Sequence, residues 1–223
     1  MWVYKKIFAA IRQYDMLDDN SRLAIAFSGG KDSMLLLNFF LDNPIVDDLF
    51  VIHIDPGFGG DIDAIKGYLE SKGVNFYIHK LNITEEIPKS DEHPCFICSR
   101  RRREYLFRIA HKNGCKTIAF GHHKDDIIVT FMMNLLFHGE VATSIPSQPI
   151  FGGKLKIIRP LYFLWEDWIE HFIREENLPV FPSKCPYEGT SKRDEIREFI
   201  ESYPHAKANL YKALFNINED YLP

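Results

Sequence analysis

The distribution of apolar and polar residues divides the chain into short apolar runs and longer stretches with helical periodicity. Runs rich in Val, Ile and Phe predict strands at residues 22–27, 49–55, 74–80 and 117–121. The stretches between these runs predict helices at residues 33–41, 62–72, 96–112 and 125–137. Strands that alternate with helices favour a doubly wound α/β fold with a mainly parallel sheet, because the crossover helices cover both faces.

An amphipathic helix is expected at the N-terminus. Val3, Ile7, Ala10 and Tyr14 recur at helical spacing in MWVYKKIFAAIRQYDML. Basic residues lie among the apolar ones, so this segment is unlike a signal peptide. Elsewhere the longest nearly apolar run, residues 127–137, is too short to cross a bilayer. We therefore expect no association with a membrane.

The pattern loosens after residue 140. Prolines and glycines predict a loop at residues 146–153, and the following KLKIIRPL predicts one more strand. An apolar stripe at helical spacing predicts a helix at residues 165–173. Two further helices are expected near residues 194–202 and 205–215, which gives the chain a helical C-terminal appendage.

Composition restricts the function more than the fold. The chain has 223 residues, of which 46% are hydrophobic and 26% charged, and this excludes disordered and fibrous proteins. The net charge of −4 argues against a surface coated with positive charge for nucleic acid, although a local basic patch remains compatible with it. Four cysteines are too few for a disulfide scaffold, which favours a reduced cytoplasm and metal or redox chemistry.

The strongest motif follows the first predicted strand. Between that strand and the next helix stands Ser28-Gly29-Gly30-Lys31-Asp32-Ser33. Glycines let the backbone approach an anion, and a helix N-terminus offers free N–H groups and the positive end of the helix dipole. The motif is not a Walker A loop, which would need glycine where Ile25 stands. It predicts a phosphate site; the alternative is a glycine turn that only caps a helix.

Two further strand ends are expected beside this loop, because parallel strands end at the same edge of a sheet. Asp55 ends VIHID and either faces a nucleotide or its metal ion, or forms the turn before Pro56. The segment after the fourth strand is Gly121-His122-His123-Lys124-Asp125-Asp126. Its two carboxylates suit Mg²⁺ shared with phosphates, or they cap the next helix. For the histidines, a bystander role is favoured over metal ligation.

Three cysteines are spaced as metal ligands. Cys95 and Cys98 form a CxxC at the start of a predicted helix, and Cys185 comes much later. Three thiolates suit an iron–sulfur cluster or zinc, and a redox pair or inert thiols are the other options. The helix start and the nearby arginines favour deprotonated sulfur. Cys115 begins a strand and is expected to be a small buried residue.

Two groups of basic residues remain. Residues 100–103 are four consecutive arginines that cover a full helical turn, so contact with phosphate by some of them is favoured over a solvated face. Lys192, Arg193 and Arg197 could extend a surface for RNA. We expect instead that they are solvated on a C-terminal helix.

The motifs resemble those of a known family. SGGKDS in this setting resembles the PP-loop ATP pyrophosphatases, which cleave ATP between the α and β phosphates and leave AMP on the substrate. Together with CFICSRRRR, GHHKDD, IRPL and a late cysteine, it is similar to the tRNA 2-thiocytidine synthetase (TtcA) group over about residues 21–187. The family commonly has a second late CxxC, but Glu188 stands here, which leaves three-cysteine ligation as the cluster arrangement.

The resemblance implies roles for individual residues. ATP and Mg²⁺ would be bound by Ser28, Gly29, Gly30, Lys31, Asp32, Ser33, Asp55, Gly121, His122, Asp125 and Asp126, with catalytic roles for Lys31 and Asp125. A [4Fe-4S] cluster would be held by Cys95, Cys98 and Cys185. tRNA would be contacted by Arg100, Arg102 and Arg103.

The resemblance also implies an organisation and an activity. We expect an amphipathic helix (residues 1–20), a PP-loop core (21–160) and a helical extension with the third cysteine (161–223), all in one compact unit. The expected enzyme is a cytoplasmic homodimer that adenylates a tRNA cytidine carbonyl and replaces its oxygen with sulfur from a donor such as a cysteine desulfurase system. The alternatives are a PP-loop enzyme that adenylates a small molecule or other nucleoside for sulfur transfer, sulfur removal or amidation, and a zinc-stapled regulator that binds nucleotide.

Overall fold

The computed structural model of this protein describes residues 1–18, 22–218 and 220. Within these residues, six strands form one sheet in the order β3-β2-β1-β4-β6-β5. They are β1 (Arg22–Ala26), β2 (Asp48–Asp55), β3 (Asn75–Lys80), β4 (Thr117–Ala119), β5 (Ser147–Ile150) and β6 (Leu155–Ile158). Neighbouring strands are parallel except for β5 and β6, which pair antiparallel. The predicted doubly wound, mainly parallel fold is confirmed.

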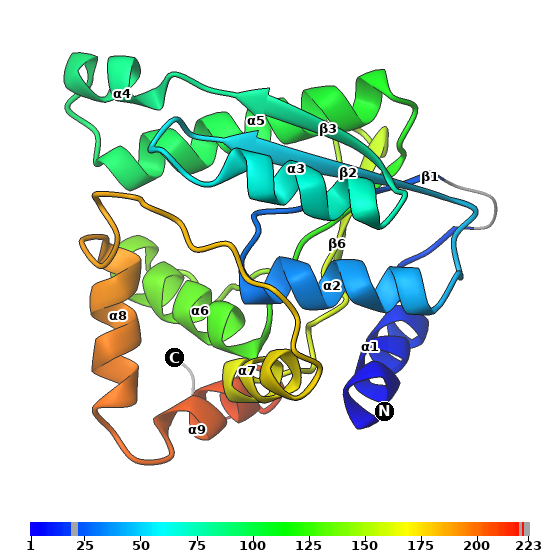
Figure 1. Cartoon of the computed structure of the whole chain (residues 1–223). Coiled ribbons are helices and arrows are strands. Elements are labelled where there is room, and N and C mark those ends of the chain that lie inside the picture. Colours follow the sequence, from blue (N-terminus) through cyan, green and yellow to red (C-terminus); the bar gives the residue numbers. More distant parts are fainter. Residues whose placement is uncertain (19–21, 219, 221–223) are drawn as a thin grey trace.

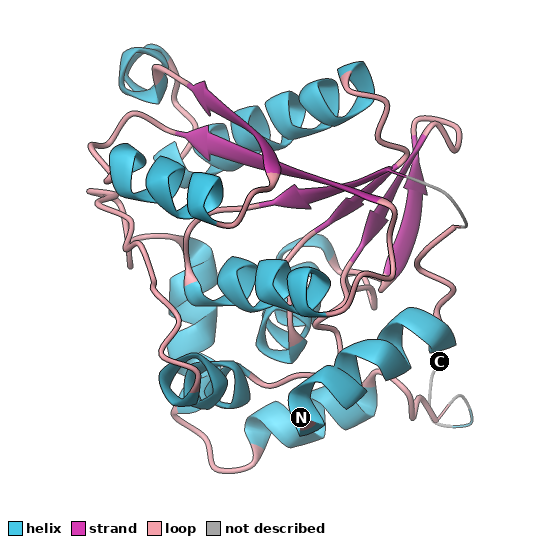
Figure 2. Cartoon of the chain, turned by 45° about the vertical axis from the view of Figure 1, so that its right-hand side comes forward, coloured by secondary structure: helices cyan, strands magenta, loops and turns pink. Residues whose placement is uncertain are grey.

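Helices cover both faces of the sheet, as Figures 1 and 2 show. They are α1 (Trp2–Gln13), α2 (Lys31–Asp42), α3 (Ile62–Ser71), α4 (Ile83–Glu86), α5 (Pro94–Lys112), α6 (Lys124–His138), α7 (Glu166–Glu175), α8 (Lys192–Glu201) and α9 (Ala206–Ala213). A short 3₁₀ helix, η1 (Ile87–Lys89), follows α4; the sequence did not indicate either of these two short elements.

Alternation along the strands decides which side chains meet which helices. Leu23 and Ile25 of β1 belong to the apolar cluster that contains residues of α1, α2 and α7. Ala24, between them, belongs to the cluster built around α5. Successive strand residues point to opposite faces, so a sheet covered on both sides needs apolar residues at consecutive positions. This explains why the strands read as nearly continuous apolar runs.

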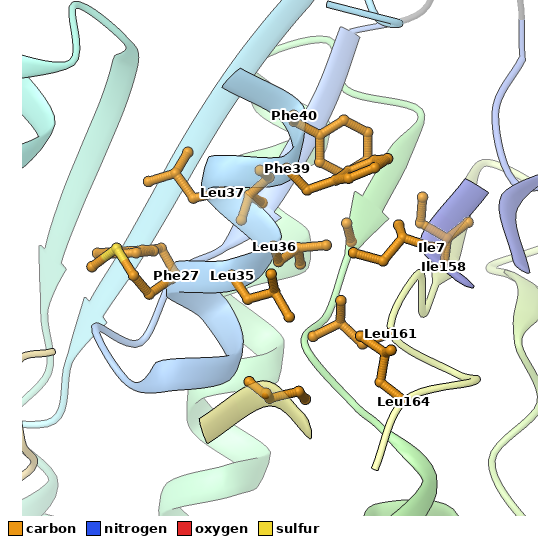
Figure 3. Close-up of a cluster of buried hydrophobic side chains, with 14 of the residues drawn as sticks. Ile7, Phe27, Leu35, Leu36, Leu37, Phe39, Phe40, Ile158, Leu161 and Leu164 are labelled. Atoms are coloured by element: carbon orange, nitrogen blue, oxygen red, sulfur yellow. The ribbon is translucent and has the colours of Figure 1, made fainter. Parts of the chain in front are cut away.

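The helix α2 forms the centre of the larger cluster. Residues 33–40 of this helix are all buried, and Figure 3 shows Leu36 directed toward Ile7 of α1 and Leu161 after β6. Burial of one Leu or Phe side chain contributes about 1.5–3 kcal/mol to stability. Packing on several sides therefore holds α2 firmly, and with it the loop that precedes its first turn.

The predicted loop at residues 146–153 is partly wrong. Residues Ser147–Ile150 form β5, which pairs with β6 through a tight turn. Pro149 lacks an N–H group, but β5 lies at the edge of the sheet, where a proline is tolerated because one side of the strand needs no partner. Phe151, Gly152 and Gly153 in the turn have φ of 52°, 65° and 83°. The sequence indicated the turn but not the strand before it.

The C-terminal helices pack on α6 rather than on the sheet. Ile128 and Met132 of α6 form a separate apolar cluster with Ile196 and Ile200 of α8, and Leu210 of α9 packs against it. The predicted helices near residues 194–202 and 205–215 are confirmed, with slightly different bounds. Within the described residues, no helix is long and apolar enough to cross a membrane.

The order of the strands creates a crevice at one edge of the sheet. The chain runs from β1 through α2 to β2 on one side of β1, whereas β4 pairs with its other side. In open α/β sheets this reversal of direction separates the loops at the carboxyl ends of the strands and leaves a site for ligands between them. The loops after β1, β2 and β4 carry the three predicted motifs.

Candidate functional site

The loop after β1 is folded by its own serines. The N–H of Ser28 donates to Ser33 Oγ (3.2 Å), the N–H of Gly30 donates to Ser28 Oγ (3.3 Å), and Ser33 Oγ donates to the carbonyl of Gly30 (3.0 Å). The helix α2 begins at Lys31, directly after this loop. The N–H groups of a first helical turn have no partner within the helix, so they are free to bind an anion. The loop therefore has the form of a phosphate cradle.

Two glycines allow other segments to approach this loop closely. Gly29 has φ of +87°, and a Cβ atom there would lie 3.1 Å from Cβ of Phe181. A Cβ atom on Gly121 would lie 3.1 Å from the backbone carbon of Asp32. The GHHKDD segment after β4 thus packs directly on the first turn of α2. The structure brings these two motifs together, as the sequence predicted.

Lys31 has a partner that the sequence did not indicate. Its Nζ donates to Oε1 of Glu166, the first residue of α7, over 2.6 Å. Burial disfavours the charged form of Lys31, but Asp32 and Glu166 more than offset this, so the pKa of Lys31 is raised. The lysine is therefore a fixed positive charge at the mouth of the phosphate cradle, held by a carboxylate 135 residues away.

The first turn of α6 gathers carboxylates around His123. The N–H of His123 donates to Oδ2 of Asp126 (3.1 Å), and its ring lies 3.3 Å from Asp125 and 3.7 Å from Asp32. Burial works against a charged imidazole, but these three carboxylates outweigh it and raise the pKa of His123. His123 is 2% exposed and acts as the N-cap of α6, so it holds the first turn of this helix in place beside the two aspartates.

The two aspartates of this turn are strongly held in the charged form. Burial disfavours their ionisation, but His123, Lys207 and the N–H of Glu166 stabilise the Asp125 carboxylate, and its pKa is lowered. For Asp126, His123 and Arg193 likewise overcome burial and lower the pKa. Both groups are therefore ionised at neutral pH and able to hold a cation.

Three cations from the C-terminal helices complete the site. Arg193 of α8 lies 2.9 Å from Asp126, Arg197 lies 2.7 Å from Glu166, and Lys207 of α9 lies 2.8 Å from Asp125. The expectation that Arg193 and Arg197 are merely solvated is wrong. The helix α8 packs on α6 and turns these two side chains into the crevice, whereas Lys192 remains exposed and pairs with Glu195.

Asp55 lies at the carboxyl end of β2 and is 7% exposed. Its Oδ1 accepts a hydrogen bond of 2.8 Å from the N–H of Gly57. The carboxylate thus shapes the turn after β2, while the strand places it at the same edge of the sheet as the phosphate cradle.

The three predicted metal-binding cysteines lie near one another. Cys95 and Cys98 open α5, and the Sγ of Cys95 lies 3.6 Å from the carbonyl of Tyr187, two residues after Cys185. Burial raises the pKa of Cys98, the two other thiols add to this, and Arg102 opposes it. The net shift is opposite to the predicted deprotonation, because burial outweighs Arg102. Cys115 is 2% exposed in the core, as predicted.

The geometry of the thiols bears on what they could hold. Each of the three thiols is close enough for its charge to affect another one. Within the described residues, however, no three Cys, His, Asp or Glu side chains converge on a point where one metal ion would bind. A zinc ion needs its ligands to converge at about 2.3 Å, whereas the thiolates of an iron–sulfur cluster bind different irons.

The segment between α7 and α8 joins the cysteines to the phosphate cradle. The N–H of Phe181 donates to the carbonyl of Gly29 over 2.9 Å. Further along the same segment, Tyr187 packs against Phe58, which follows β2. Figure 1 shows this segment crossing from the start of α2 toward the N-terminal end of α5. Cys185 is therefore brought to the other two cysteines by a strap that is fastened to the cradle.

The arginines of α5 divide into two groups. Arg100 pairs with Glu92 and lies over the ring of Phe96, and Arg103 donates to its own helix; both are exposed. Arg102 points inward, where it interacts with Cys98 and where its Nε has no hydrogen-bond partner among the described residues. The three predicted RNA contacts therefore do not share one surface.

Comparisons with known proteins show the family and the fold of this chain. The PP-loop domain family matches residues 3–202 of the chain. The tRNA-cytidine(32) 2-sulfurtransferase of Geotalea uraniireducens (strain Rf4) is 32% identical over 234 residues, which cover 99% of this chain and 93% of that protein. The structure of the U34-tRNA thiolase NcsA from Methanococcus maripaludis with its [4Fe-4S] cluster aligns with a TM-score of 0.78 and 26% identity, covering 97% of this chain and 80% of that one. The NH₃-dependent NAD synthetase from Campylobacter jejuni shares the fold at 13% identity, with a TM-score of 0.58 and coverage of 97% and 96%.

Proposed function

We propose that this chain, which belongs to the PP-loop family and within it to the tRNA-cytidine(32) 2-sulfurtransferases, activates a tRNA cytidine with ATP and converts it to 2-thiocytidine. A ring carbonyl oxygen is a poor leaving group. In the first step this oxygen attacks the α phosphorus of ATP, and pyrophosphate leaves. In the second step sulfur attacks the ring carbon, and AMP departs with the former carbonyl oxygen.

The loop of residues 28–33 and the first turn of α2 would bind the phosphates. The free N–H groups of that turn and the Lys31 ammonium would stabilise the charge that develops on pyrophosphate. Asp32, Asp55, Gly121 and His122 would bound the same pocket. The close packing of Gly121 on Asp32 supports this arrangement, because it leaves no side chain between the two motifs.

The Asp125 and Asp126 carboxylates are the proposed ligands for Mg²⁺. Magnesium prefers hard oxygen ligands and usually shares one or two carboxylates with phosphate oxygens. The lowered pKa values of both aspartates support this role, because ionised carboxylates are available at neutral pH. When bound, the ion would supply positive charge against the triphosphate.

Cys95, Cys98 and Cys185 are the proposed ligands of a [4Fe-4S] cluster. The mutual influence of the three thiols supports this role, because it places them near one another, and thiolates are the usual protein ligands of iron–sulfur clusters. Glu188 replaces a second late cysteine, so three thiolates would leave one iron of a bound cluster open to a sulfur ligand from outside. The raised pKa values of Cys95 and Cys98 mean that cluster binding would release protons.

The proposal also covers the partners of this protein and its location. The exposed Arg100 and Arg103 are the proposed contacts for tRNA phosphates, and Arg102 would act on the cluster side of α5 instead. A sulfur donor such as a cysteine desulfurase system, a homodimeric state and a cytoplasmic location complete the proposal. So does the division into an N-terminal helix, a PP-loop core and a C-terminal extension.

One observation carries this function furthest. The hydrogen bond from Phe181 to Gly29 fastens the strap with Cys185 to the phosphate cradle. This contact supports a location of the thiols on the same side of the molecule as the cradle, as a reaction that joins ATP activation to sulfur transfer requires. An enzyme that only adenylates a small molecule for amidation would need no thiol cluster at that place.

Nucleoside analysis of tRNA tests this proposal. A deletion strain should lack 2-thiocytidine, and expression of the wild-type chain should restore it. Cys185→Ala should fail to restore it while the purified variant still binds ATP, because the strap remains fastened at Phe181. Cys115→Ala, which removes a thiol from the core, is the matched control and should restore it.

The colour of the protein adds an independent check. Protein purified without oxygen should be brown, and the Cys185 variant should lose the colour. An unchanged nucleoside profile in the deletion strain would refute the tRNA thiolation activity. A colourless wild-type protein with tightly bound zinc would refute the cluster.

A further inference from the structure

Two arginines of α8 point into the phosphate side of the crevice. Arg193 and Arg197 stand one helical turn apart, and their side chains are 36% and 30% exposed. Arg193 donates to Asp126 and to the hydroxyl of Thr130, and Arg197 lies 3.7 Å from the same aspartate. Lys192, on the same helix, is 65% exposed and faces solvent. The helix thus separates its cations between the crevice and the surface.

Glu166 connects Arg197 to the lysine of the cradle. Its Oε1 accepts from Lys31 over 2.6 Å, and its Oε2 accepts from Arg197 over 2.7 Å. A carboxylate that bridges a lysine and an arginine in this way uses two oxygens of one anion. Phosphate offers the same kind of acceptor, and arginine favours it because of its fork of donors. Lys31 and Arg197 are therefore close enough for a single phosphate group to bind both.

The charged groups of the crevice are paired with one another. Each of these cations has a carboxylate partner in the site: Lys31 pairs with Asp32 and Glu166, Arg193 with Asp126, Arg197 with Glu166, and Lys207 with Asp125. A partly buried cation without a counter-ion is costly. Glu166 and Asp126 supply that counter-charge for the two arginines. A triphosphate brings more negative charge than this arrangement can accept without some exchange of partners.

We propose that Arg193 and Arg197 bind the β and γ phosphates of ATP and the pyrophosphate product, and that Glu166 holds Lys31 and Arg197 until those phosphates replace it. This inference rests on the proposed function and names residues of the same site on α7 and α8. The exchange breaks two ion pairs of Glu166 and forms ion pairs with phosphate, and no covalent bond changes. It also places a cost on pyrophosphate binding, which favours release of the product.

Binding of inorganic pyrophosphate and of AMP tests the arginines. Calorimetry with the full-length, cluster-loaded protein should give about tenfold to a hundredfold weaker pyrophosphate binding for Arg193→Gln and Arg197→Gln, since each loses charged hydrogen bonds. AMP has no β phosphate, so its affinity should stay within about twofold. Lys192→Gln removes the same charge from the outer face of α8 and should change neither affinity.

Substitution of Glu166 should strengthen pyrophosphate binding, whereas substitution of the arginines should weaken it. In Glu166→Gln the competing charge is gone while the size of the side chain is kept, so pyrophosphate should bind several-fold more tightly. The same variant should show stronger inhibition of turnover by pyrophosphate, with lower KM for ATP and lower kcat. A residue that served only to hold α7 in place would weaken binding of both ligands.

The outcomes separate this inference from the function on which it rests. Unchanged pyrophosphate affinity in both arginine variants, or equal loss of pyrophosphate and AMP, would overturn the role of α8. Weaker or unchanged binding in Glu166→Gln would overturn the exchange. If an arginine variant fails to fold, Arg193→Lys and Arg197→Lys provide the test, because they keep the charge but lose the fork of donors and should weaken pyrophosphate binding several-fold without a change in AMP affinity. Wild-type protein that makes 2-thiocytidine keeps its proposed function in any of these cases, and wild-type protein that binds no pyrophosphate overturns this inference alone.

Discussion

Adjacent histidines in the GHHKDD segment show how strongly position decides the chemistry of a side chain. His122 stacks on the ring of Phe120, and burial lowers its pKa to about 4 despite the opposing charge of Asp126. His123 is buried as well, but Asp125, Asp126 and Asp32 surround it and raise its pKa. At neutral pH, therefore, His122 is uncharged, whereas the neighbouring carboxylates favour the charged form of His123.

Gly121 offers a prediction at the same scale. In Gly121→Ala the added Cβ would lie 3.1 Å from the backbone of Asp32, so the first turn of α2 would have to move by a few tenths of an ångström. Because that turn carries the phosphate cradle, we expect ATP affinity to fall by about tenfold, a typical result of a small misplacement in a site. Isothermal titration measures it.

Gly67→Ala is the control for this substitution. Gly67 lies within α3, where a Cβ atom would meet nothing within 4 Å. Alanine there should raise stability by about 0.5–1 kcal/mol and leave ATP binding unchanged. Equal ATP affinity in Gly121→Ala and wild type would show that the two motifs do not form one site.

The helix α8 shows how one element can serve two parts of the crevice. Its start is fixed by a capping box, in which Ser191 Oγ accepts from the N–H of Asp194 and the Asp194 carboxylate accepts from the N–H of Ser191. The charge of Asp194 reaches Cys95, while Arg193 and Arg197 reach the phosphate side. The cap thus sets the position of groups at both the cysteines and the cradle.

Removal of this cap should affect stability and binding together. Ser191→Ala should lower the free energy of unfolding by about 1 kcal/mol, as for other helix N-caps. Pyrophosphate affinity should also fall, by a few-fold, because Arg193 follows the cap by two residues. Chemical unfolding and calorimetry measure the two effects.

Ser202→Ala provides the comparison at the other end of α8. Ser202 Oγ donates to the carbonyl of Phe199 on the exposed side of the helix. Its loss should leave pyrophosphate affinity unchanged. If Ser191→Ala lowers stability without any change in pyrophosphate affinity, the start of α8 does not position the arginines.

At the scale of the whole molecule, positive charge is concentrated locally although the net charge is negative. The chain has a net charge of −4, yet α5 presents Arg100 and Arg103 on its exposed side, close to the proposed cluster ligands. Since α5 and α3 pack on opposite faces of the sheet, the two helices present separate surfaces. Attraction to a polyanion would therefore be local and sensitive to salt.

Salt-dependent tRNA binding tests this distribution. The double variant Arg100→Gln, Arg103→Gln should weaken tRNA binding and lower the slope of log affinity against log salt by about one for each lost phosphate contact. Its affinity for ATP should not change. The matched double variant at α3 and its C-cap, Lys66→Gln with Lys72→Gln, should leave tRNA affinity and the slope unaltered. Equal effects of the two double variants would mean that α5 is not the RNA-binding surface.

Local chemistry let the sequence determine the fold class and the central motif. Apolar runs at consecutive positions predict strands buried on both sides, and SGGKDS between a strand and a helix already defines a phosphate cradle, because its form depends on neighbouring residues. The CxxC at the start of α5 is local in the same sense. Pro149, by contrast, made the sequence of β5 look like a loop. Only the order of the strands shows that β5 lies at an edge of the sheet, where the missing N–H needs no partner.

Only the tertiary structure decided which charges meet in the crevice. Lys31 and Glu166 are 135 residues apart, and nothing near either of them in the sequence indicates the other. Arginines on an amphipathic helix look the same in sequence whether they face water or a buried carboxylate. The packing of α8 on α6 settles this for Arg193 and Arg197. The hydrogen bond from Phe181 to Gly29 and the contact between Cys95 and Tyr187 bring the segment with Cys185 to the other two cysteines. Ion pairs and hydrogen bonds between segments that are distant in the sequence depend on how the helices pack, and that packing is a property of the whole fold.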